Sequence, residues 1–322
     1  MSHNVLVTGV GGVVGQGILR NIAACAYDIR LIGTNTGRVS AGNHLCDQVY
    51  DVPFSYEDGY LEQMRTICRE ENIDLIIPAT DYEVYYLATA QNTLPPVVGS
   101  PAETAKIFLD KYLTWLEFEK LGIPFAESSL PSAYNGEFPE CIVKPREGRG
   151  SRGIHFNPEN PRSFSEDNVV QKLHHGIEIT TGFYVTRERK ILGHITLERT
   201  LSSGATNSCS VTFDHDDEIG RIITQIVEAF EIRGSCNVQS IVTSDNRIIP
   251  FEINCRISGT NSIRSQFGFT DVKYTIDEHL YHKPLTQPHI SKGSAVRILL
   301  DVIYPGIGLD DVQNKNTPHY LY

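Results

Sequence analysis

The chain has 322 residues, of which 40% are hydrophobic, and its 28 basic and 39 acidic side chains give a formal net charge of -11 at pH 7. This composition predicts two or three soluble globular domains, and an acidic chain without a run of Lys or Arg excludes nucleic acid as a partner. No apolar run is long enough to span a membrane, and seven scattered cysteines without a CxxC pair favour a reducing cytoplasm over a disulfide framework.

The first hundred residues alternate strands with helices, which predicts a parallel, doubly wound sheet. A strand at Asn4–Thr8 enters the glycine-rich turn Gly9–Gly15, and a helix follows. This is the opening of a Rossmann-like unit, but the next strand, Arg30–Gly33, is not followed by a carboxylate that could hold a ribose. We therefore expect these glycines to permit tight packing of strand against helix. Further strands are predicted at Gln48–Val52, Asp74–Pro78 and Val97–Val98, and further helices at Tyr56–Glu71 and Tyr82–Gln91.

The pattern changes after Ser100. Pro101 can open a short helix, and Asp110 can cap a second helix that stops at Gly122. Strands and hairpins then dominate, followed by a helix over Asp216–Ile232, so the second part is predicted to be α+β. Strands are expected at Cys141–Lys144, Gly153–Phe156, Val169–Leu173, Glu178–Val185 and Lys190–Leu197. The segment Leu201–Ser210 is predicted to be a loop, and Asp310–Tyr322 a loosely held tail.

Two stretches of this second part carry groups that suit a nucleotide. Lys144 ends a buried strand and precedes a loop with three glycines, which places a cation beside backbone N–H groups that can wrap an anion. The alternative is a glycine-rich turn with solubilising arginines. The strand Val169–Leu173 can offer its backbone to a planar base, and Glu178 can accept from ribose hydroxyls or be a solvated strand-edge residue.

A third stretch, Gly234–Arg256, is predicted to be a β-hairpin that turns at Ser244–Asn246. Alternation along its second strand predicts two faces, with Phe251, Ile253 and Cys255 on one and Glu252, Asn254 and Arg256 on the other. Asn237 or Gln239 of the first strand can join the polar face. Such oxygen ligands suit Mg²⁺ that also holds phosphate oxygens, although an amphipathic surface hairpin gives the same pattern.

In this order and spacing, the three stretches resemble the ATP-grasp superfamily, most closely the branch of the carbamoyl phosphate synthetase large subunit and stand-alone carboxylate-amine ligases. The resemblance implies a Rossmann-like domain at 1–110, ATP-grasp subdomains at 111–174 and 175–305, and a tail at 306–322. It implies an ADP-forming ligase that activates a carboxylate as an acyl phosphate for attack by an amine or another nucleophile, using ATP and Mg²⁺ or Mn²⁺. Its partners would be small molecules, with no membrane partner and with a homodimer left open.

The resemblance also implies roles for individual residues. Lys144 and Arg256 would be catalytic, with Arg256 stabilising the transferred phosphate. The nucleotide would be held by Lys111, Lys144, Gly148, Arg149, Gly150, Ser151, Gly153, Gln171, Lys172, Leu173 and Glu178. The metal ligands would be Gln239, Glu252 and Asn254, although Gln239 stands where many relatives carry a carboxylate.

Substrate residues are less determined. Arg199, Ser258 and Arg264 are candidates for gripping the acceptor carboxylate, or else a surface arginine or a loop-capping serine. His174, His175 and His215 lack metal-ligand spacing and are predicted to be solvated. A nicotinamide-dependent reductase or epimerase is a competing class, but no tyrosine near Tyr82 has the Lys at the required spacing. A nucleotide-binding regulatory protein without turnover is the other alternative.

Overall fold

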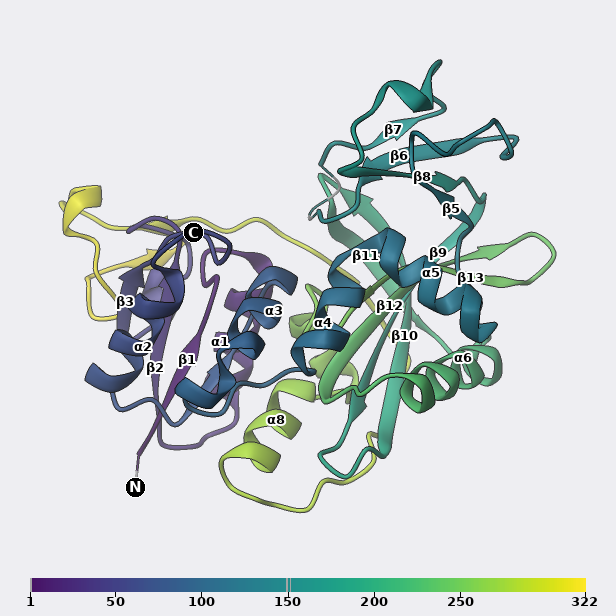
Figure 1. The fold of residues 1–322 in the computed structure, drawn as a ribbon. Coiled ribbons are helices and arrows are strands. Elements are labelled where there is room, and N and C mark those ends of the chain that lie inside the picture. Colours follow the sequence, from purple (N-terminus) through teal and green to yellow (C-terminus); the bar gives the residue numbers. More distant parts are fainter. Residues whose placement is uncertain (1, 149, 151) are drawn as a thin grey trace.

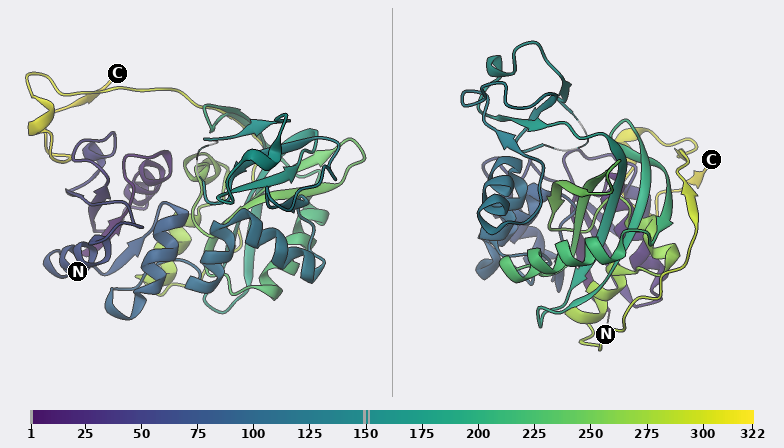
Figure 2. Two further views of the ribbon diagram at one scale, coloured as in Figure 1. Left: turned by 45° about the horizontal axis from the view of Figure 1, so that its top comes forward. Right: turned by 90° about the vertical axis from the view of Figure 1, so that its right-hand side faces the viewer.

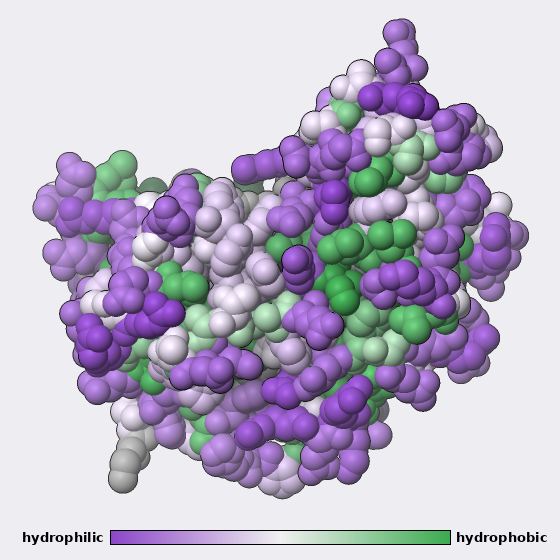
Figure 3. All heavy atoms as spheres, in the orientation of Figure 1, coloured by the Kyte–Doolittle hydropathy of each residue, from purple (hydrophilic) through white to green (hydrophobic). Residues whose placement is uncertain are grey.

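The computed structural model describes residues 2–148, 150 and 152–322. An N-terminal body, a smaller raised lobe and a large antiparallel sheet follow one another along the chain (Figure 1). The predicted combination of a parallel sheet with an α+β second part is confirmed. In the space-filling view the lobe rises above the other two parts, and apolar side chains on the visible face gather over α4 (Ala102–Leu109) and α5 (Lys111–Leu121) (Figure 3).

The N-terminal body is built on a parallel sheet with the strand order β3-β2-β1-β4. Its strands are β1 (His3–Val7), β2 (Ile29–Asn35), β3 (Gln48–Asp51) and β4 (Leu75–Ile77), and its helices are α1 (Val13–Ala24), α2 (Tyr60–Glu70) and α3 (Asp81–Thr89). The glycines after β1 serve close packing, because a Cβ on Gly15 would lie 2.5 Å from the carbonyl oxygen of Gly9. The core of the N-terminal body also includes three side chains from much later in the chain, namely Ile257, Val272 and Ile276.

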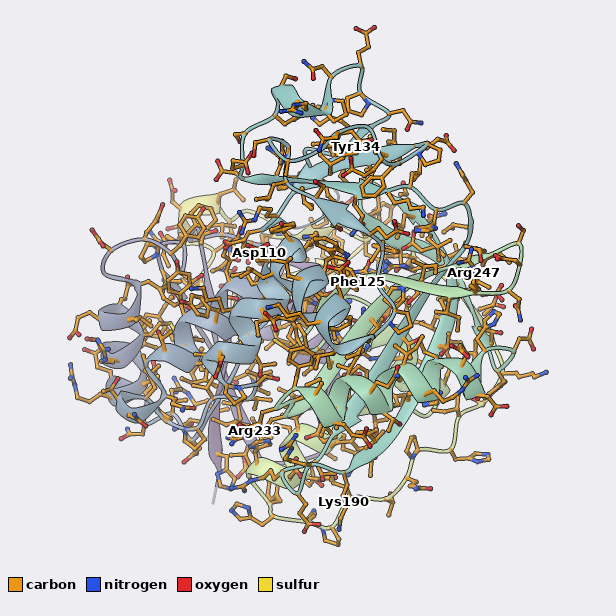
Figure 4. The ribbon with its side chains drawn as sticks, turned by 45° about the vertical axis from the view of Figure 1, so that its right-hand side comes forward. Asp110, Phe125, Tyr134, Lys190, Arg233 and Arg247 are labelled. Atoms are coloured by element: carbon orange, nitrogen blue, oxygen red, sulfur yellow. The ribbon has the colours of Figure 1, made fainter. Side chains whose placement is uncertain are left out.

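Helices α4 and α5 link the body to the rest of the chain. Asp110 stands at their junction, where its carboxylate accepts hydrogen bonds from the backbone N–H of Tyr112 (2.9 Å) and of Leu113 (3.2 Å) and so caps α5 (Figure 4). Gly122 ends α5 in the left-handed conformation, with φ of 67°. Both predicted helix signals are confirmed.

The lobe is a sheet with the order β5-β8-β6-β7 and a small core of its own around Tyr134 and Val143. Its strands are β5 (Ser128–Ser129), β6 (Cys141–Pro145), β7 (His155–Phe156) and β8 (Asn168–Lys172). Tyr134 lies within the lobe, which stands above α5 in Figure 4. The lobe therefore covers one end of the large sheet without sharing its core.

The large sheet has the order β13-β12-β9-β10-β11-β14 and is covered on one face by α6 (Asp216–Ala229), whose apolar side packs into the main core. Its strands are β9 (Gly176–Val185), β10 (Ile191–Ser202), β11 (Ala205–Thr212), β12 (Gly234–Thr243), β13 (Ile248–Asn254) and β14 (Ser294–Val296). The predicted loop at 201–210 is wrong, because β10 and β11 form a hairpin that turns at Ser203 and Gly204. Its many Ser and Thr residues concealed the strand alternation.

After α7 (Asn261–Arg264) and α8 (Asp271–His279), residues 282–322 form a strap that returns to the N-terminal body (Figure 2). The strap edges the large sheet as β14, and its end forms a short ribbon of β15 (Val302–Ile303) and β16 (Tyr320–Leu321). Lys315 pairs with Asp47 at 2.7 Å, and Val312 is fully buried. The prediction of a loosely held tail is therefore wrong. None of the helices in the described residues is both long and apolar enough to cross a membrane.

Candidate functional site

A cavity of about 840 Å³ lies where the lobe, the large sheet and the N-terminal body meet. It is long enough to receive side chains from β6 and β8 at one end and from the loops after β1 and β4 at the other. Most of the residues predicted to form a site line this cavity, although they are spread over more than a hundred positions of the sequence. A single pocket with both apolar walls and converging polar groups is typical of a ligand site.

A β-bulge in β13 divides one wall of the cavity into an apolar and a polar part. Gln239 pairs with Glu252, but the next residue, Ser240, pairs with Pro250, so Phe251 is an extra residue on its strand. Phe251 consequently faces the cavity, and not the core that holds Ile253 and Cys255 as simple alternation predicted. The polar face of the hairpin itself is confirmed, since Gln239, Glu252, Asn254 and Arg256 all line the cavity.

Two lysines face Glu252. Lys111, at the first position of α5, approaches its carboxylate at 3.8 Å, and its own backbone N–H donates to the carbonyl of Arg146. Arg146 in turn pairs with Asp110, so the start of α5 is tied to the start of the glycine loop (residues 146–153). The ammonium of Lys144 lies 5.2 Å from the centre of the Phe251 ring.

The charged groups of this cluster shift one another's pKa values. Burial, and then the nearby charge of Lys111, lower the pKa of Lys144 to about 7, which Glu252 and Glu178 only partly offset. Burial alone would raise the pKa of Glu252, but Lys111 and Lys144 outweigh it and hold that pKa below its ordinary value. A carboxylate is thus kept ionised next to a lysine that is poised to gain a proton when an anion arrives.

The glycine loop and the tip of the β10–β11 hairpin meet over the cavity. Gly148, Gly150 and the hairpin tip at Ser203 and Gly204 all contribute to its lining. The approach is close, because a Cβ on Gly204 would lie 2.4 Å from the carbonyl oxygen of Gly150. Gly153 does not line the cavity but adopts φ of 66° over Pro145. The predicted residues Arg149 and Ser151 lie outside the described residues.

The lobe supplies the far end of the cavity. Gln171, Lys172 and Leu173 line it as predicted, with the Gln171 amide donating to Ser128 at 3.1 Å and Lys172 paired with Glu127 at 2.7 Å. His174 also lines the cavity, where it is half-buried and burial lowers its pKa, so it is less exposed than predicted. Apolar side chains complete this end, namely Ala126, Ile142, Ile154, Phe156, Ile241, Ile249 and Phe251.

Arg199 links two of the predicted groups. Its guanidinium donates to Glu178 at 2.6 Å and to the amide oxygen of Gln239 at 2.5 Å. It therefore lies beside the predicted ribose and metal residues, while Ser258 lines the opposite end of the cavity. This arrangement does not favour the binding of one acceptor carboxylate by both Arg199 and Ser258.

Arg264 does not line the cavity. Its side chain is fully buried in an ion pair with Asp271, and it donates to the hydroxyl of Ser258 at 2.8 Å. The guanidinium occupies space left by Gly182, where a Cβ would lie 2.3 Å from its nitrogen. The predicted direct contact with substrate is therefore wrong, and Arg264 instead holds the loop that carries Ser258.

Three groups at the end of the cavity next to the N-terminal body were not predicted from the sequence. Asp81, at the start of α3, pairs with Arg256 through two hydrogen bonds of 2.8 and 3.0 Å. Arg297 of the strap donates to the carbonyl of Gly259. Burial lowers its pKa. Tyr82 lies beside them. No local pattern marks these residues, because each reaches the cavity from a distant part of the chain.

The ligand set of Gln239, Glu252 and Asn254 fits a hard cation only if phosphate oxygens also coordinate that cation. It offers one carboxylate and two amide oxygens, and these side chains already bond to one another, with Asn254 donating to Glu252 at 3.1 Å and accepting from Gln239 at 3.2 Å. No group of three His, Cys, Asp or Glu residues that could hold a metal ion occurs in the described part of the chain. Oxygen ligands suit Mg²⁺, which completes its shell with phosphates and water.

Two different family models match the N-terminal part and the second part of the chain. Residues 5–95 match the model of the PylC-like N-terminal domain, and residues 108–260 match that of the ATP-grasp domain. No curated protein sequence matches the chain.

Solved structures share the fold at low identity. One is N5-carboxyaminoimidazole synthetase from Staphylococcus aureus with ADP, at 12% identity and a TM-score of 0.74 over 92% of this chain and 82% of that one. The carboxyaminoimidazole ribonucleotide synthase of Aspergillus clavatus with ATP has 14% identity and a TM-score of 0.70 over 89% and 78%. The biotin carboxylase domain of the Hydrogenobacter thermophilus 2-oxoglutarate carboxylase has 13% identity and a TM-score of 0.71 over 94% and 75%.

Proposed function

The chain belongs to the ATP-grasp superfamily, through the domain at residues 108–260, and we propose that it is an ADP-forming ligase that joins a carboxylate to an amine. The observation that carries this proposal is the cluster of Lys111, Lys144 and Glu252 with Arg256 along one continuous cavity. Phosphoryl transfer requires cations at oxygens that gather negative charge, and this wall provides them. The solved structures named above include complexes with ADP and with ATP.

The shape of the cavity supports a direction for the nucleotide. The base would lie at the lobe end, against Leu173, His174 and the apolar wall that the bulged Phe251 completes. Gln171 and Lys172 flank that end, and Glu178 would meet the ribose while Arg199 fixes it. The phosphates would then reach Lys111 and Lys144, beneath Gly148 and Gly150 of the glycine loop.

The metal ion would be held by Glu252, Asn254 and Gln239 together with phosphate oxygens. When bound, it would neutralise the charge of the phosphates during transfer to the carboxylate. Lys144 orients and neutralises the transferred group, and its low pKa means that phosphate binding also brings a proton to its nitrogen. Arg256, held by Asp81, is placed to stabilise the acyl phosphate until the amine attacks.

A screen for ADP release tests the proposal. The protein is incubated with MgATP and pools of amino acids and other small carboxylates and amines, and ADP and phosphate are measured. Carboxylate-dependent release of both supports the proposal, and release of AMP with pyrophosphate would contradict it. A regulatory protein would bind MgADP in calorimetry without releasing phosphate with any pool.

Two finer parts of the proposal concern the surroundings of the protein. We propose small-molecule partners and a cytoplasmic location, which the seven unpaired cysteines support, since six of them are buried thiols. Light scattering after size-exclusion chromatography tests whether the chain forms a homodimer. A dinucleotide site at the glycine turn is the disfavoured alternative, since Gly15 is needed there for packing.

A further inference from the structure

Arg297 reaches the cavity from the strap, at the end next to the N-terminal body. The strap runs along the edge of the large sheet before it crosses to that body (Figure 2), and the backbone N–H of Arg297 donates to the carbonyl of Asn207 at 2.7 Å. The guanidinium donates to the carbonyl of Gly259 at 2.9 Å. Gly259 borders the start of α1, because a Cβ on it would lie 3.8 Å from the Val13 side chain. Arg297 is therefore held where the strap, the loop after β13 and α1 meet.

The Arg297 guanidinium is a half-buried cation whose charge is not compensated. Burial lowers the pKa of Arg297, the Cys209 thiol offsets this only in part, and the nearby charge of Arg20 adds to it. The contact with Gly259 uses one of the five N–H donors that a guanidinium carries. A cation in this state favours an anion, and the planar fork of an arginine suits a carboxylate or a phosphate.

The start of α1 adds positive potential at the same end of the cavity. Gly12, Val13 and Val14 line the cavity there, and α1 has neither a capping side chain at its N-terminus nor an acidic residue in its first turn. The free N–H groups at such a helix start favour an anion. Asp81 supplies a carboxylate at this end, but that carboxylate is paired with Arg256. Positive charge is therefore in excess here.

The proposed nucleotide site does not need Arg297. The phosphates would lie against Lys111 and Lys144, and Arg256 would meet the acyl phosphate. Arg256 donates to the carbonyl of Ile257 at 3.1 Å, and Arg297 donates to a carbonyl two residues later. Because two residues of chain span only about 7 Å, the two donor nitrogens lie within about 15 Å of each other. One small substrate, or an acid and an amine bound side by side, can bridge that distance.

From this geometry we infer that Arg297 is a substrate-binding residue that holds a carboxylate or phosphate group which is not activated in the reaction. The inference rests on the proposed function and adds a feature of the substrates: the acid or the amine carries an anionic group besides the carboxylate that becomes the acyl phosphate. The strap is then part of the substrate site and not only an edge of the large sheet.

Neutral analogues of the substrates test the inference without a variant. In the acid and in the amine found by the screen, each anionic group that is not activated is replaced in turn, a carboxylate by its primary amide and a phosphate by the free alcohol. We expect kcat/KM to fall about tenfold to a hundredfold for the analogue of one substrate, because charge-assisted hydrogen bonds are lost. The analogue that fails shows which substrate carries the anion. Full activity with every analogue, or best turnover by an acid and an amine without a further anion, would overturn the inference.

Arg297→Gln assigns the effect to Arg297. The variant keeps an N–H donor for the carbonyl of Gly259 but loses the charge, and the measured quantity is the ratio of kcat/KM for the charged substrate to that for its neutral analogue. This ratio should fall to within about threefold of unity. Arg297→Lys keeps the charge without the fork and should give an intermediate ratio. Lys292→Gln, which removes an exposed cation from the same strap, should leave the ratio as it is in the unmodified protein.

A purely structural role of Arg297 predicts a different result. It would lower kcat/KM for the charged substrate and for its analogue together and leave their ratio unaltered. An unaltered ratio in Arg297→Gln would therefore overturn the inference. Failure of the unmodified protein to release ADP with any acid and amine would instead refute the proposed function.

Discussion

Nucleotide binding should draw a proton from solution, and Lys144 is the reason. With a pKa of about 7, its nitrogen is about half protonated at pH 7 and only about one-tenth protonated at pH 8. Phosphate oxygens favour the charged form, so binding of MgADP should raise that pKa well above 8. The expected uptake is then about 0.5 proton per nucleotide at pH 7 and about 0.9 at pH 8, and affinity should fall up to about tenfold per unit of pH above 7.

Calorimetry measures this directly. MgADP is titrated at each pH in buffers with different ionisation enthalpies, and the slope of observed enthalpy against ionisation enthalpy gives the number of protons taken up. Lys144→Met should abolish the uptake. Lys111→Met should reduce it, because removal of the neighbouring charge raises the pKa of Lys144 in the free protein. Lys120→Met, an exposed change on the same helix as Lys111, should leave it unaltered.

The result that refutes this reasoning is specific. If the unmodified protein takes up no proton at pH 8 while it binds MgADP normally, then either Lys144 is already charged or it does not meet the phosphates. Uptake that persists in Lys144→Met would assign the proton to another group.

Three further predictions concern the metal, the buried ion pair and the glycine turn. Glu252→Ala should abolish the Mg²⁺ dependence of ADP affinity, because the other two metal ligands are neutral amides. For the same reason, MgCl₂ without nucleotide should leave the Tm of the unmodified protein unchanged. A shift of the Tm with MgCl₂ alone would contradict this. Asp271→Asn leaves Arg264 buried without its anion and should lower the free energy of unfolding in urea by about 3–5 kcal/mol; a loss below about 1 kcal/mol would show that the pair is dispensable. Gly15→Ala forces a Cβ to 2.5 Å from the Gly9 oxygen and should cost about 1–3 kcal/mol in the same assay, whereas NAD should not stabilise the unmodified protein.

Local signals in the sequence predicted much of the fold. The Asp110 cap, the Gly122 stop and the hairpin at 234–256 each depend on a few neighbouring residues, and the structure confirms all three. The same locality explains the errors. The bulge at Phe251 depends on how β13 pairs with β12, and the fate of Arg264 depends on the space beside Gly182.

The sequence predicted the site residues that belong to motifs with a recognisable spacing, but not those that reach the site through contacts between distant parts of the chain. Asp81 and Arg256 are 175 positions apart, and Arg297 enters the cavity from the strap, so neither contact leaves a pattern in the sequence. His174 was placed in a loop, but burial at the cavity wall decides its environment. The division of the chain into segments at 1–110, 111–174, 175–305 and 306–322 stays a prediction.

A core shared between distant parts of the chain limits how this chain can be divided. Ile257, Val272 and Ile276, which complete the packing beneath the first parallel sheet, come from the segment after β13 and from α8. A fragment truncated near residue 100 would leave that apolar surface bare and should aggregate when expressed alone. A chimaera that exchanges the first hundred residues with those of another protein would also need the α8 of that protein, because the first hundred residues do not complete their own core.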